Sequence, residues 1–174
     1  MAESSEEEWL VAKDSWRIDF DVWVKDLAAA VPVYTTRYGL GPWKYTELKA
    51  PILRDARFRG EPVEVDMIAA ISELGPMGIE LLQVRGGSES VMNWASELPD
   101  GYWHPCAYHA TVEEADKAFA DLEQRGFSAV LSGRIDGSNF YMLDAGDLFG
   151  RMIEVAGGPL SSIEWTSTPT DGTP

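Results

Sequence analysis

An internal duplication constrains the fold of this chain more than any other feature of its sequence. The order strand, helix, strand, strand, strand is predicted once over residues 16–86 and again over residues 103–157. An Ile-Glu pair stands at matching places in the last strand of each copy, at 79–80 and 153–154. Each copy has a helix on one face of its sheet and must bury or use the other face. The sequence therefore predicts an α+β fold in which two tandem βαβββ modules pair into a cupped, barrel-like mixed sheet with helices outside.

The remaining segments are predicted to be tails and a linker around one domain. Residues 1–15 begin with an acidic stretch that lacks the apolar core of a signal peptide. Residues 87–102 are a linker with a short helix, and residues 158–174 are a C-terminal tail rich in Ser, Thr, Pro and Gly. Three arginines at positions 54, 57 and 59 are expected on a loop between strands.

The charge of the chain excludes several classes of partner. Lys and Arg total 14 against 29 Asp and Glu, which gives a formal net charge of −15. Nucleic acids and anionic membrane surfaces both require concentrated basic residues, so neither is expected as a partner. No apolar run reaches the length of a membrane span, and the single cysteine, Cys106, cannot form an internal disulfide. We therefore expect a cytoplasmic protein whose partner is a small molecule.

Strict alternation predicts which side chains of the first module face the cup. In the strand at residues 17–24 the aliphatic side chains point toward the helix, so Asp19, Asp21 and Trp23 point into the cup. The same alternation in the last strand of each module places Glu80 and Glu154 in the cup, together with Met152. Trp23 and Met152 would give the cup an apolar part that suits a flat or apolar ligand.

In the second module the predicted faces depend on how the two copies are aligned. Matching residues 24–26 to residues 112–114 makes position 109 the counterpart of Asp21. His109 and Thr111 then point into the cup, and Cys106 points toward the helix as a small buried hydrophobic residue. His104 is expected at the mouth of the strand, reaching over the opening.

Several ionisable side chains in a largely apolar cup suggest chemistry. Clustered carboxylates raise one another's pKa, which suits a general base or acid, and they also suit a divalent cation. A further hydroxyl is expected from Tyr141, in a strand of the second module. The alternative is that Glu80 and Glu154 form a structural pair across the pseudo-twofold axis that relates the two modules, with their charges compensated and no role in chemistry.

The duplicated module and three short motifs resemble a known family. The motifs are YGLGPW at residues 38–43, IELL at residues 79–82 and IEV at residues 153–155. Together they resemble the vicinal oxygen chelate superfamily, which includes glyoxalase I, methylmalonyl-CoA epimerase, extradiol dioxygenases and bleomycin-resistance proteins. The Gly-Pro-Trp turn and IELL resemble the epimerase-like branch most. The resemblance covers residues 16–157.

The resemblance implies a divalent metal held by the first and last strands of each module, usually through two His and two Glu. Glu80 and Glu154 match the last-strand positions, whereas Asp19 and Ala107 stand where the first-strand histidines are usual. One implied site is Mg²⁺, Mn²⁺, Zn²⁺ or Ni²⁺ on Asp19, Glu80 and Glu154 with His104 or His109. The other implied site holds no metal and uses the carboxylates directly. Because the first-strand histidines are missing, an extradiol dioxygenase is not expected.

The function expected from these residues is acid–base proton transfer next to a carbonyl, as in an isomerase, epimerase, lyase or cyclase of the glyoxalase-like type. The substrate is expected to be largely apolar or aromatic, and the chain to be a homodimer, as many of these relatives are. The alternative is a protein that sequesters an aromatic or polycyclic compound, as bleomycin-resistance proteins do. The candidate catalytic residues are Glu80, Glu154, Asp19, His109, His104 and Tyr141, and the candidate substrate-lining residues are Asp21, Trp23, Thr111 and Met152.

Overall fold

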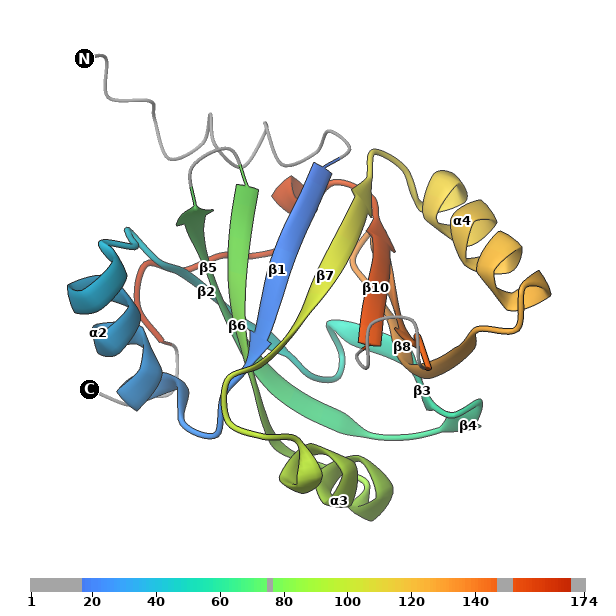
Figure 1. Cartoon of the computed structure of the whole chain (residues 1–174), viewed down its shortest axis with the longest axis horizontal. Helices are drawn as coiled ribbons and strands as arrows, with labels where there is room; N and C mark the ends of the chain where they lie inside the picture. Colours follow the sequence, from blue (N-terminus) through green and yellow to red (C-terminus); the bar gives the residue numbers. More distant parts are fainter. Residues whose placement is uncertain (1–16, 75–76, 147–151, 170–174) are drawn as a thin grey trace.

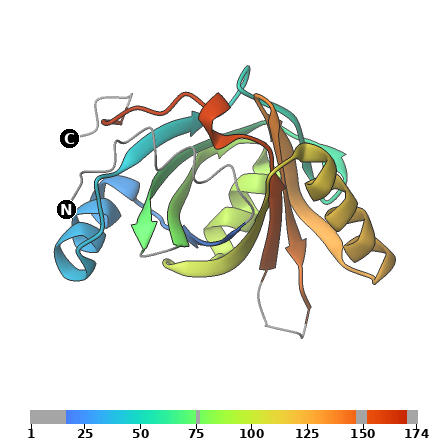
Figure 2. The same ribbon diagram turned by 90° about the horizontal axis from the view of Figure 1, so that it is seen from above.

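A computed structural model describes residues 17–74, 77–146 and 152–169 of the chain. Their strands form one ten-stranded mixed sheet in the order β2-β5-β6-β1-β7-β10-β9-β8-β3-β4. The sheet curls into a half-barrel, with α2 and α4 outside it (Figures 1 and 2). The predicted α+β architecture of a cupped sheet with outer helices is therefore confirmed. None of the helices in the described ranges has the length and apolarity that crossing a bilayer requires.

Each half of the sheet follows the predicted strand–helix–strand–strand–strand order. The first half contains β1 (Arg17–Trp23), α2 (Leu27–Tyr38), β2 (Lys44–Leu48), β5 (Val65–Leu74) and β6 (Met77–Gly87). The second half contains β7 (Tyr102–His109), α4 (Val112–Gln124), β8 (Ser128–Ile135), β9 (Ser138–Asp144) and β10 (Met152–Gly157). The two halves meet where β1 pairs antiparallel with β7, so a single chain makes the whole cup.

An additional hairpin extends the sheet beyond the two predicted modules. It consists of β3 (Leu53–Phe58) and β4 (Glu61–Pro62), which lie between β2 and β5 in sequence. β3 crosses to the far edge of the sheet and pairs antiparallel with β8 of the second half. The predicted arginine-bearing loop is thus wrong for Arg54 and Arg57, which lie on β3. The sequence of β3 does not show the alternation of a half-buried strand, because only Leu53 and Phe58 at its two ends are buried and the charged side chains between them are exposed.

Separate apolar clusters fill the two sides of the sheet. On the convex side, α2 packs with Leu27 over Val22 and Leu81, and α4 packs with Ala115 over Leu143 and Val155. The largest cluster fills the concave side, and it includes residues of both halves, of the β3–β4 hairpin and of α3 (Glu89–Glu97). The concave side, which we call the cup, is therefore a packed interior as well as the predicted location of the site.

Residues beyond β10 also contribute to the cup. A short 3₁₀ turn at Leu160–Ser162 follows the last strand, and Leu160 and Ile163 are buried in the concave cluster. Tyr45 of β2 and Thr166 form an isolated antiparallel bridge with two backbone hydrogen bonds of 2.8 and 2.9 Å. The segment 160–166 therefore runs from β10 across to β2 (Figure 2).

The two outer helices begin at equivalent caps. Asp26 accepts a hydrogen bond from the backbone N–H of Ala29 at the start of α2. Thr111 accepts one from the backbone N–H of Glu114 at the start of α4. The Glu114 carboxylate accepts one from the Thr111 N–H, which completes a capping box. Asp26 and Thr111 are thus counterparts, so the predicted alignment of the two copies is wrong by three residues.

This error reverses the predicted faces of β7. Successive side chains of a strand alternate between its faces, so a shift by an odd number of residues exchanges the two faces. Cys106 and Tyr108 belong to the cluster inside the cup, not to the helix-facing side.

Candidate active site

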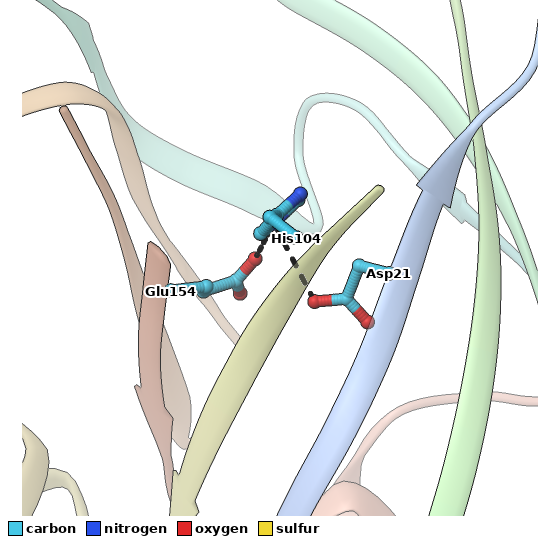
Figure 3. A group of neighbouring side chains, drawn as sticks. All are labelled: Asp21, His104 and Glu154. Atoms are coloured by element: carbon cyan, nitrogen blue, oxygen red, sulfur yellow. Dashed lines mark hydrogen bonds and ion pairs between the residues drawn. The ribbon is translucent and has the colours of Figure 1, made fainter. Parts of the chain in front are cut away.

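Polar side chains from the four central strands converge in the cup. Asp21 of β1 is in register with Glu80 of β6 on one side and with His104 of β7 on the other. Glu154 of β10 is in register with Cys106, two residues along β7 from His104. We call Glu80, Asp21, His104 and Glu154 the polar row. Three of its members are drawn in Figure 3, where the imidazole of His104 lies between the two carboxylates.

The imidazole of His104 is the centre of the polar row. Its Nε2 atom lies 3.1 Å from Glu154 Oε2 and 3.6 Å from Asp21 Oδ2. Its Nδ1 atom lies 3.3 Å from Nε1 of Trp23, whose indole N–H donates to it. His104 is completely buried, and Asp21 and Glu154 are buried as well. Every polar atom of the ring therefore has a protein partner.

Burial and like charges shift the ionisation of this cluster. Desolvation raises the pKa of Asp21 well above its usual value, and the nearby Glu154 and Glu80 carboxylates raise it further. Burial lowers the pKa of His104, against the opposing effect of Asp21. Both shifts favour neutral forms, so the cluster carries less charge than its residue types suggest. Burial likewise raises the pKa of the Cys106 thiol, which favours the inert thiol over a thiolate nucleophile.

The polar row borders a small cavity in the cup. The cavity has a volume of about 60 Å³, and both Glu80 and Glu154 line it. The rest of its wall is mostly apolar and includes residues of the segment 160–166. The apolar and aromatic lining consists of Leu48, Met67, Leu82, Tyr108, Ile135, Phe140, Met142, Ala156, Leu160, Ile163 and Trp165.

The structure brings part of the predicted set together. Glu80 and Glu154 face the same cavity, and Trp23 and Met152 are buried in the concave cluster, as the alternation of their strands predicts. Asp19 is buried in β1, where its Oδ1 accepts a hydrogen bond from the backbone N–H of Gly78. Asp19 therefore lies next to the polar row and does not contact the His104 imidazole as Asp21 and Glu154 do.

His109 and Thr111 do not reach the cup. Because His104, Cys106 and Tyr108 face it, alternation puts His109 on the convex face of β7. Thr111 lies beyond the end of the strand, where it is exposed and caps α4. Both placements were wrong for the same reason, which is the three-residue error in aligning the two modules.

Tyr141 also lies outside the cup. Its hydroxyl donates a hydrogen bond of 2.6 Å to Asp116 of α4, and its ring stacks on Phe119 of the same helix. Burial and the bond to Asp116 raise the pKa of Tyr141 to about 12. The predicted hydroxyl at the site is therefore a contact between β9 and its covering helix.

Asp21 has a more central place in the polar row than the sequence predicted. It was expected to line the substrate, yet its carboxylate lies against the His104 imidazole. The capping signal T-x-x-E at residues 111–114 predicts this contact, because it aligns Thr111 with Asp26, the cap of the first helix. In that alignment the side chain of His104 faces the cup, on the strand that pairs with the strand of Asp21.

Asp21, His104 and Glu154 offer three potential metal-ligand atoms, all within 4.8 Å of one another. This spacing and the two carboxylates suit a divalent cation. The surroundings of the imidazole do not suit one, because a metal at Nε2 requires the ring proton on Nδ1, and the Trp23 N–H already points at that atom. The carboxylates fit a cation, whereas the imidazole as hydrogen-bonded here does not.

The family model of the Glyoxalase/Bleomycin resistance protein/Dioxygenase superfamily matches residues 20–141, well over half of the chain. The chain belongs to this superfamily. The matched residues run from β1 to β9 and include Asp21, Glu80 and His104 of the polar row. Among curated proteins, none matches the chain.

Solved structures similar to this superfamily member are distant in sequence. A methylmalonyl-CoA epimerase in complex with methylmalonyl-CoA and NH4+ is 20% identical, with a TM-score of 0.49 over 86% of this chain and 99% of that one. A hypothetical protein from Bacillus halodurans C-125 is 14% identical, with a TM-score of 0.50 over 82% and 94%. A variant of 4-hydroxymandelate synthase from Streptomyces coelicolor is 13% identical, with a TM-score of 0.53 over 88% of this chain and 42% of that one. At these identities the similarity concerns the fold.

Proposed function

We propose that this protein is an enzyme that moves protons at a carbon next to a carbonyl group. The observation that carries the proposal is the Glu154–His104–Asp21 cluster, buried in the wall of a cavity that Glu80 also lines. Buried ionisable groups that border a concave site and have shifted pKa values are typical of general acid–base catalysis. An apolar cup would strengthen their electrostatic effect on a bound substrate by excluding water.

In the proposed reaction, Glu154 is the base. Its carboxylate takes the proton, the electrons of the C–H bond form a carbon–carbon double bond, and the carbonyl oxygen gains the negative charge. Glu80, from the other flank of the polar row, returns a proton to the carbon and the double bond reverts to the carbonyl. The reaction ends with Glu154 protonated and Glu80 ionised, and exchange with water restores both.

His104 and Asp21 are proposed to set the state of the base. The imidazole lies within hydrogen-bonding distance of Glu154 and fixes the direction of its carboxylate. Asp21, whose raised pKa favours the neutral acid, limits the negative charge beside Glu154. Together they would allow Glu154 to be ionised in a buried place without a neighbouring full charge.

The cup supports a largely apolar or aromatic carbonyl compound as substrate. Its lining is dominated by aliphatic, Met and aromatic side chains, with acidic groups on the polar row. The reaction class is an isomerisation or epimerisation, or an elimination or cyclisation that starts from the same proton abstraction.

Exchange of substrate hydrogen for solvent deuterium tests this proposal. Aryl ketones, acyl thioesters and 2-oxo acids are incubated with the protein in D2O, and exchange at the carbon next to the carbonyl is followed by proton NMR. We expect the wild-type chain to catalyse exchange in one of these classes. Glu154→Gln should slow it by about 10²- to 10⁴-fold, which is the usual contribution of a general base.

Two further variants make the result specific. Glu80→Gln should retain exchange but lose inversion or net conversion, since abstraction is assigned to Glu154. Glu123→Gln removes one carboxylate from the exposed face of α4 and should behave as wild type. If compounds bind with saturation but none exchanges, or if Glu154→Gln exchanges at the wild-type rate, acid–base catalysis is wrong. The sequestration of an aromatic compound would then be the better explanation of the apolar cup.

A further inference from the structure

Trp23 makes a contact that the proposed proton transfer does not explain. It is the last residue of β1, 4% exposed, and its indole ring stacks against His104 with 6.2 Å between ring centroids. Its Nε1–H donates to Nδ1 of the imidazole at 3.3 Å. Trp94 from α3 packs edge-to-face with Trp23, with 5.2 Å between the ring centroids, and does not take part in the hydrogen bond to the imidazole.

This hydrogen bond determines which imidazole nitrogen carries the proton. An indole nitrogen can only donate, so Nδ1 of His104 must accept and cannot itself be protonated. The ring proton therefore resides on Nε2, the atom that faces Glu154 and Asp21. The same contact opposes the doubly protonated imidazolium, which has an N–H at both positions.

We propose that Trp23 is a positioning residue that holds His104 in the Nε2–H tautomer and thereby makes the polar row a proton-handling site rather than a cation-binding one. Histidines that bind a metal usually donate their other ring N–H to an acceptor. In this chain that other nitrogen faces a donor. A cation at Nε2 must therefore displace the ring proton and break the Trp23 hydrogen bond. The tautomer follows from the contact itself, whereas its use in catalysis rests on the proposed function.

Nitrogen-15 NMR of the imidazole reads the tautomer directly. The chain has only two histidines, so the His109→Gln background leaves the His104 signals alone. His109 lies on the convex face of β7, and its replacement does not touch the polar row. We expect a wild-type spectrum with a protonated Nε2 and an unprotonated Nδ1. Trp23→Phe, which keeps an aromatic ring but loses the N–H, should shift the population toward the Nδ1–H tautomer.

Calorimetric titration with Zn²⁺ and Mn²⁺ measures the consequence for cation binding. We expect Trp23→Phe to bind Zn²⁺ about 10- to 100-fold more tightly than the wild-type chain, which is the range over which outer-shell partners alter metal affinity. Trp94→Phe is the matched control, because it removes a similar volume from the same cluster without touching the imidazole. Its tautomer and Zn²⁺ affinity should match the wild type.

Different results overturn the inference and the proposed function. An Nδ1–H tautomer in the wild-type chain contradicts the inference, even if Trp23→Phe fails to fold. Equal Zn²⁺ affinity in Trp23→Phe and Trp94→Phe contradicts the claim that the Trp23 hydrogen bond disfavours cation binding at His104. Absence of deuterium exchange in every substrate class leaves the tautomer assignment intact and contradicts only the catalytic role.

Discussion

The buried carboxylate of Asp21 belongs to the candidate site but lowers the free energy of unfolding at neutral pH. It is 2% exposed, and burial together with two neighbouring glutamates raises its pKa. A buried acid with a raised pKa binds a proton more readily in the folded chain than in the unfolded chain. Stability therefore falls as the pH rises above the ordinary Asp range, and it is regained on acidification. At neutral pH the folded protein bears the cost of this group.

We predict that Asp21→Asn stabilises the protein at pH 7. The amide keeps the shape of the side chain and cannot ionise, so the free energy of unfolding should rise by about 0.5 to 2 kcal/mol. The gain should shrink as the pH falls toward 4, where the unfolded carboxyl also becomes protonated. Urea unfolding at several pH values measures both effects. Asp121→Asn, at an exposed position of α4, is the control and should show no such gain. A loss of stability at pH 7 would contradict the raised pKa.

At the scale of the elements, the order of strands and helices was largely predictable and the facing of β7 was not. The alternation of β1 and of β10 correctly gave the cup-facing positions of Asp21, Glu154 and Met152. β7 has no such clear alternation in its sequence, since its YWHPCAYH places aromatic residues on both faces. Its facing had to be taken from the repeat, and there the helix caps are a better reference than the apolar residues.

The β3–β4 hairpin shows a second limit of sequence reasoning. Its sequence LRDARF has charged or small residues between two buried ends, which resembles a solvated loop. The strand forms because β8 of the other half offers a free edge, to which β3 adds its backbone hydrogen bonds. No local pattern encodes a partner more than 70 residues away, so only the fold as a whole reveals it.

The capping role of Thr111 gives a prediction at this scale. Thr111→Ala removes the acceptor for the Glu114 N–H and should lower the free energy of unfolding by about 1 kcal/mol. Thr111→Ser keeps the hydroxyl and should remain close to wild type. Deuterium exchange of substrate should be unchanged in both variants, because the residue lies on the convex side of the sheet. Loss of exchange in Thr111→Ala with unchanged stability would show instead that Thr111 reaches the cup.

For the molecule as a whole, the closure of the cup matters more than its lining. The cavity of about 60 Å³ is far smaller than the about 300 to 1,000 Å³ that small-molecule sites usually enclose. The segment 160–166 contributes Leu160, Ile163 and Trp165 to its wall. Beyond Ile163, Tyr45 and Thr166 join this segment to the sheet through two backbone hydrogen bonds and a longer one from the Thr166 hydroxyl to the Tyr45 carbonyl oxygen. It is therefore the element whose displacement opens the cup with the smallest loss of sheet pairing.

We predict that fixing this segment closes the site. Tyr45 and Thr166 form a hydrogen-bonded antiparallel pair, whose Cα atoms are typically about 5.5 Å apart and so suit a disulfide. In the double variant Tyr45→Cys/Thr166→Cys, the oxidised form should lose at least about 90% of substrate deuterium exchange, because a substrate enters only after the segment opens. Reduction with dithiothreitol should restore it, which separates closure from damage by the substitutions. Equal exchange by the oxidised and reduced forms would mean that substrate reaches Glu154 by a route that leaves the segment in place.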